Sequence, residues 1–62
     1  MNIEKIIEIM ELKNISKYRL SKLSNVSETQ IGKILNGIHS DPHISTVKKI
    51  AKALEVGINE II

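Results

Sequence analysis

Apolar residues along the chain recur mostly at spacings of three and four, which is typical of helix faces rather than of strands. The first such run predicts a helix from about Ile3 to Lys13, ending at Asn14, with Asn2 as its N-cap. The residues of this helix that we expect to face inward are Ile3, Ile6, Ile7 and Met10.

Two short helices follow, each opened by a serine that suits the N-cap position. Ser16 opens the first, which ends near Ser24, and Asn25 tolerates the left-handed conformation of a helix end. Ser27 opens the second with a capping box to Gln30, and Asn36-Gly37 ends it. We expect these side chains to face inward: Leu20, Leu23, Ile31, Ile34 and Leu35.

Pro42 places residues 38–43 in a loop, because proline is not accommodated inside a helix. A fourth helix is predicted over about 44–54, with Val47, Ile50, Ala51 and Leu54 inward. After Gly57, a short fifth helix carries Ile58, Ile61 and Ile62. The sequence therefore predicts an all-α fold, a compact bundle of five short helices forming one domain over residues 1–62.

The second and third helices, at about 17–24 and 28–36, are separated by a turn of three residues, Asn25, Val26 and Ser27. Two helices that cross steeply must approach closely, and the small side chain of Ser21 permits this. Four apolar residues of the pair are expected to point inward: Leu20, Val26, Ile31 and Ile34. This combination is typical of a helix-turn-helix motif.

At these residues the chain resembles the Cro and phage-repressor type of helix-turn-helix domain, also called XRE-like, and the resemblance covers residues 6–62. It implies a lambda-repressor-like fold and a sequence-specific DNA-binding transcriptional regulator, repressor-like in function. The segments that carry it are Ile15-Ser16, residues 20–27, Ile31, Ile34, Asn36-Gly37, Pro42, residues 50–56 and residues 58–61.

The resemblance implies that a recognition helix from Glu28 to Asn36 enters the major groove of double-stranded DNA. The implied base-reading residues are Glu28, Thr29, Gly32 and Lys33. The implied phosphate contacts are Ser16, Lys17, Ser27 and Asn36, with His39, Ser40 and His43 from the following loop.

The chain departs from the family pattern at four places. Lys17 stands where the family usually has glutamine, Glu28 is acidic at the leading edge of the recognition helix, and Gly32 lies inside that helix. The family often joins its first and third helices by a buried ion pair. In this chain the two positions of that ion pair are occupied by apolar residues, Met10 and Leu35. We therefore expect their side chains to touch.

Charge and composition reduce the number of functions that the sequence allows. The net charge of the 62 residues is only +2, but residues 11–40 hold five basic and two acidic side chains, so the positive excess coincides with the motif. Tyr18 is the single aromatic residue, which argues against base stacking. We find no nucleophile constellation or phosphate-binding loop, so neither an enzyme, a cofactor nor a small-molecule substrate is expected. With no cysteine and no targeting pattern, the sequence favours the cytoplasm.

Metal binding and membrane binding are both disfavoured by the sequence. His39 and His43 are four residues apart, but Pro42 prevents them from sharing a helix face and no third ligand supports them. Contact with phosphate or simple exposure remains open for both. The first helix carries carboxylates on its outer face, the wrong sign for an anionic lipid surface, at Glu4, Glu8 and Glu11.

The C-terminal isoleucines suggest a contact between two copies. Ile58, Ile61 and Ile62 expose apolar surface unless they pack on the core or on a partner. A homodimer, at least on DNA, would bind an operator with an inverted repeat. The alternative is a protein–protein interaction module, antitoxin-like or an adaptor, that uses the same fold with weak or no DNA binding.

Overall fold

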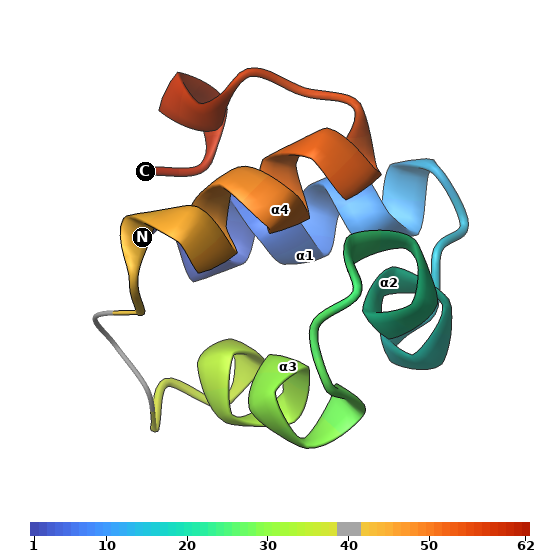
Figure 1. The fold of residues 1–62 in the computed structure, drawn as a ribbon. Coiled ribbons are helices and arrows are strands. Elements are labelled where there is room, and N and C mark those ends of the chain that lie inside the picture. Colours follow the sequence, from blue (N-terminus) through green and yellow to red (C-terminus); the bar gives the residue numbers. More distant parts are fainter. Residues whose placement is uncertain (39–41) are drawn as a thin grey trace.

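The computed structural model describes residues 1–38 and 42–62, which form four α-helices, one 3₁₀ turn and no strand (Figure 1). The elements are α1 (Ile3–Leu12), α2 (Lys17–Ser24), α3 (Glu28–Leu35), α4 (Ile44–Leu54) and η1 (Ile58–Glu60). The predicted all-α class is confirmed. The predicted short fifth helix forms only as a 3₁₀ turn, because the backbone leaves helical geometry at Ile61, where φ is −119°.

The first three helices begin at the predicted N-caps. The backbone N–H groups of Lys5, Arg19 and Gln30 donate to the side-chain oxygens of Asn2, Ser16 and Ser27 over 3.0, 3.1 and 3.1 Å. Each such cap contributes about 1 kcal/mol to helix stability. The serine half of the capping box at Ser27 is therefore present.

Helices α1, α3 and α4 end in the same way. The residue after each C-terminal turn is left-handed, and the next amide donates back across it, from Ile15 to Met10, Ile38 to Lys33 and Val56 to Ala51, over 2.8, 2.9 and 3.0 Å. The left-handed residues are Asn14, Gly37 and Glu55, with φ of 56°, 76° and 59°. The sequence predicted helix ends at the first two of these residues, whereas the left-handed conformation of Glu55 was not predicted, because glutamate has no preference for it.

The core draws on every helix and on the C-terminal segment. Its buried apolar residues are Ile6, Ile9, Met10, Leu20, Val26, Ile31, Ile34, Val47, Ile50, Ala51, Leu54 and Ile61. Two inward predictions are wrong: Ile7 is 39% exposed and Leu23 is 49% exposed. Residues three and four apart share a helix face. The face of α1 that turns inward contains Ile9, and that of α2 contains Ser24.

Helix α2 packs on both α3 and α4, α3 also contacts α1, and η1 packs on α4. The two ends of the chain meet, since the N–H of Asn2 donates to the carbonyl of Ile61 over 2.7 Å. In Figure 1, α3 runs along the lower edge of the molecule. It buries Ile31 and Ile34 and leaves its opposite side uncovered.

Candidate nucleic-acid interface

The turn between α2 and α3 is held by backbone conformation and by a buried serine. Asn25 is left-handed, as predicted, and Val26 is buried. The Ser24 hydroxyl donates to the carbonyl of Leu20 over 2.6 Å and accepts from the N–H of Val26 over 3.3 Å. This role of Ser24 was not predicted from the sequence. The available signal was a serine four residues after a buried leucine, from which a hydroxyl reaches back to the helix carbonyl.

The four residues expected to read bases lie on one outer face of α3. Glu28, Thr29 and Lys33 are exposed and Gly32 is half-buried. Their spacing along the helix brings them together opposite Ile31 and Ile34, which hold α3 on the core. The outer face of α3 thus offers one carboxylate, one hydroxyl and one ammonium group. That these groups read bases stays a prediction.

Several predicted phosphate ligands are exposed at the helix ends. The oxygens of Ser16 and Ser27 accept from backbone N–H groups, and a hydroxyl that accepts still has its hydrogen to donate. Asn36 is the exposed C-cap of α3, and His43 is exposed where α4 begins. His39 and Ser40 lie outside the described residues. Donation to phosphate by any of these groups stays a prediction.

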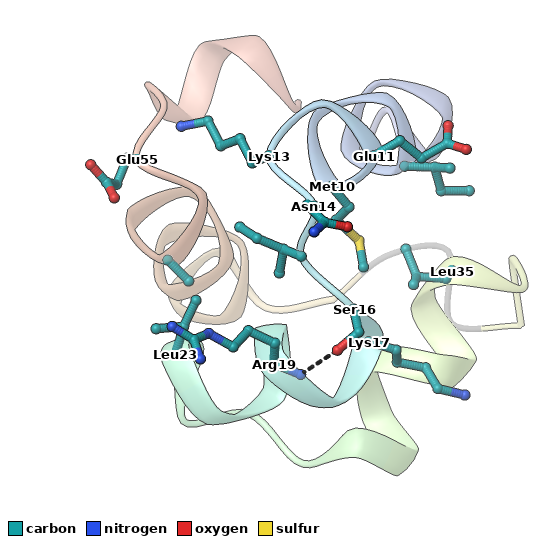
Figure 2. A pocket seen from close by; sticks show the side chains of 13 residues that line it. Met10, Glu11, Lys13, Asn14, Ser16, Lys17, Arg19, Leu23, Leu35 and Glu55 are labelled. Carbon is teal, nitrogen blue, oxygen red and sulfur yellow. Dashed lines mark hydrogen bonds between the residues drawn. The ribbon is translucent and has the colours of Figure 1, made fainter.

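Lys17, the first residue of α2, reaches across to α3. A Cβ atom placed on Gly32 would lie 3.7 Å from Nζ of Lys17 and 3.9 Å from its Cδ. The end of the lysine side chain therefore lies beside the middle turn of α3. In Figure 2, Lys17 extends away from Ser16 towards α3.

A hollow of about 790 Å³ lies beside the start of α2, and Ser16, Lys17 and Arg19 are among the residues that line it (Figure 2). Its walls come from the end of α1, the connection to α2 and parts of α2 and α4, with Leu35 from α3. Met10 and Leu35 both line it, with Met10 buried and Leu35 half-buried. This is consistent with the packed pair expected from the sequence, although direct contact between the two side chains stays a prediction.

The three C-terminal isoleucines have different environments. Ile61 is fully buried in the core, Ile58 is half-buried, and Ile62 is 64% exposed. Ile62 lines a second, smaller hollow, whose other walls are Met1, Pro42, Ile44 and Val47. Of the three, Ile62 is thus the side chain available to a partner.

Residues 1–38 and 42–62 contain no group of three or more His, Asp or Glu side chains placed to hold a metal ion. Among the same residues, no helix has both the length and the apolar character needed to cross a membrane.

Two capped helices joined by a turn of three residues that begins with left-handed Asn25, with the outer face of the second helix exposed, define a helix-turn-helix domain. The sequence profile of the helix-turn-helix family of XRE type matches residues 6–61. The chain belongs to this family, whose members are DNA-binding regulatory domains rather than enzymes. No curated protein and no solved structure matches the chain.

Proposed function

We propose that this chain is a sequence-specific, repressor-like regulator of transcription in which residues 1–62 act as one DNA-binding domain. The observation that carries the proposal is the exposed outer face of α3, held on the core by Ile31 and Ile34. A helix fits the major groove of B-form DNA, where each base pair presents a distinct pattern of donors and acceptors. Such a regulator acts where the DNA is. The sequence favours the cytoplasm as this location.

Each group on the outer face of α3 has a chemistry suited to a base edge. The ammonium of Lys33 donates to guanine N7 and O6, and the carboxylate of Glu28 accepts from the amino group of cytosine. The hydroxyl of Thr29 both donates and accepts, whereas Gly32, which lies beside the end of Lys17, offers no side-chain group of its own.

Contacts with phosphate would fix the position of α3 in the groove. The hydroxyls of Ser16 and Ser27 and the amide of Asn36 donate to phosphate oxygens from the ends of α2 and α3. His39, Ser40 and His43 would donate to phosphate as well. Such contacts carry little sequence information.

Two copies would bind an operator with an inverted repeat. A single small module buries roughly 600–1,000 Å² on DNA, less than a tight specific complex usually needs. A two-fold dimer places two recognition helices about 34 Å apart, which is one turn of the double helix. The apolar side chain of Ile62 is the best exposed of the three C-terminal isoleucines for the contact between copies, since Ile58 is half-buried and Ile61 is fully buried.

Selection of bound sequences from a random duplex pool tests this function. We expect two related half-sites in inverted orientation, with centres about one helical turn apart. Absence of any enriched sequence would contradict sequence-specific binding. Absence of binding even to random duplex at low salt, with a stable heterocomplex in a pull-down, would support the antitoxin-like or adaptor alternative instead.

A further inference from the structure

Gly32 is the one residue without a side chain on the outer face of α3. It is nevertheless half-buried, whereas its neighbours Glu28, Thr29 and Lys33 are exposed. The atoms nearest to a Cβ built at Gly32 are Nζ and Cδ of Lys17, at 3.7 and 3.9 Å. The space beside the middle turn of α3 is therefore occupied by a side chain that comes from α2.

This placement brings a positive charge to the groove side of the motif. Gly32 follows Glu28 by four residues and precedes Asn36 by four, so all three lie on the outer face of α3. The lysine stem passes from the start of α2 to this face and ends in its ammonium group. A stem that lies along a helix surface can hold its charged end in a defined place.

We propose that Lys17 reads a base, in place of the side chain that α3 lacks at Gly32. The inference rests on the proposed function, because it requires α3 to lie in the major groove. An ammonium group is only a donor, and the acceptor pair N7 and O6 of guanine is its usual target on a base edge. Lys17 therefore specifies a guanine opposite the middle turn of α3, whereas the resemblance to the phage-repressor type of domain implies that this residue contacts a phosphate.

The sharpest test compares three lysine variants in the same selection from random duplex. Lys17→Met keeps the unbranched stem and removes the charge and the donor hydrogens. We expect the preference for guanine at one position of each half-site to fall by about tenfold or more, with the other positions unchanged. Lys33→Met should remove a preference at a different position. Lys22→Met is the control, because Lys22 lies on α2 beside Tyr18 and should leave every preference intact.

The outcomes separate this inference from the proposed function. If Lys17→Met weakens binding to all sequences alike, Lys17 is a phosphate contact and this inference is overturned, while the proposed function stands. If the wild-type chain enriches no sequence, both are overturned. The geometry is tested without DNA, by nuclear Overhauser effects between the side-chain methylenes of Lys17 and the α protons of Gly32. If these effects are present, they support the placement of the Lys17 side chain beside Gly32. If they are absent, this placement is overturned.

Discussion

At the residue scale, Asn14, Asn25 and Glu55 adopt the left-handed conformation without being glycine. Each ends a helix and sets the direction in which the chain continues. Asparagine accepts this conformation with little strain, but for most L-residues it costs roughly 1–2 kcal/mol. Glu55 also places a negative charge at the C-terminal end of α4, where the helix dipole disfavours it.

Glu55→Gly is therefore expected to stabilise the fold. Relief of strain and of the unfavourable charge outweighs the greater chain entropy of glycine, so the free energy of unfolding should rise by about 0.5–1 kcal/mol. Urea unfolding followed by circular dichroism measures this change. Glu8→Gly is the matched control: Glu8 lies within α1, where the same replacement should lower stability by about 0.5–1 kcal/mol. A loss of stability in both variants would contradict the argument.

Lys13 joins two distant parts of the chain through one hydrogen bond. Its ammonium group donates to the carbonyl of Leu54 over 2.6 Å and so satisfies an acceptor at the C-terminal end of α4. Lys13→Met should lower the free energy of unfolding by about 1 kcal/mol, which is less than the roughly 1.5–3 kcal/mol of a typical hydrogen bond to a charged group, because the site is only partly buried. Chemical denaturation provides the measurement. Lys48→Met, at an exposed position of α4, should change stability by less than about 0.5 kcal/mol.

At the element scale, the features that local interactions determine, namely the positions and ends of the α-helices, were predictable from the sequence. The four α-helices follow from apolar spacing, from the caps at Asn2, Ser16 and Ser27, and from the terminator Gly37. Ile7 and Leu23 were misassigned because each lies at the edge of an apolar stripe, where the packing of neighbouring helices decides which residue is covered.

One part of the candidate site was likewise predictable from local sequence, and another part was not. The spacing along α3 fixes that Glu28, Thr29 and Lys33 share a face, so this part of the site was predictable. The reach of Lys17 to Gly32 depends on how two helices lie against each other, which periodicity alone does not determine.

Ser24 links the geometry of α2 to that of the turn and of α3. Removing its hydroxyl leaves the buried N–H of Val26 without its hydrogen-bond acceptor. Ser24→Ala should therefore lower the free energy of unfolding by about 1–2 kcal/mol and speed hydrogen exchange at the amide of Val26. Ser45→Ala, at an exposed position of α4, serves as control and should affect neither quantity appreciably. Unchanged exchange at Val26 in the Ser24 variant would exclude this role for the hydroxyl.

At the scale of the whole molecule, the two ends of the chain are joined by a backbone hydrogen bond. The N–H of Asn2 donates to the carbonyl of Ile61, and the Ile61 side chain is fully buried. The next residue, Ile62, instead exposes its side chain beside an apolar hollow that also includes Met1, Pro42 and Ile44. Folding and association can thus be tested separately at two adjacent isoleucines.

Replacing Ile61 and Ile62 by serine, one at a time, distinguishes core packing from contact between two copies. Ile61→Ser should lower the free energy of unfolding by at least about 3 kcal/mol, because it replaces a buried aliphatic side chain by a smaller polar one. Ile62→Ser should change stability by less than about 0.5 kcal/mol, since the side chain is 64% exposed. If Ile62 contacts a second copy, this variant binds an isolated half-site normally and the full inverted repeat more weakly. Titration of both duplexes measures the difference, and equal affinity of the variant and the wild type for the full repeat would exclude Ile62 from the dimer contact.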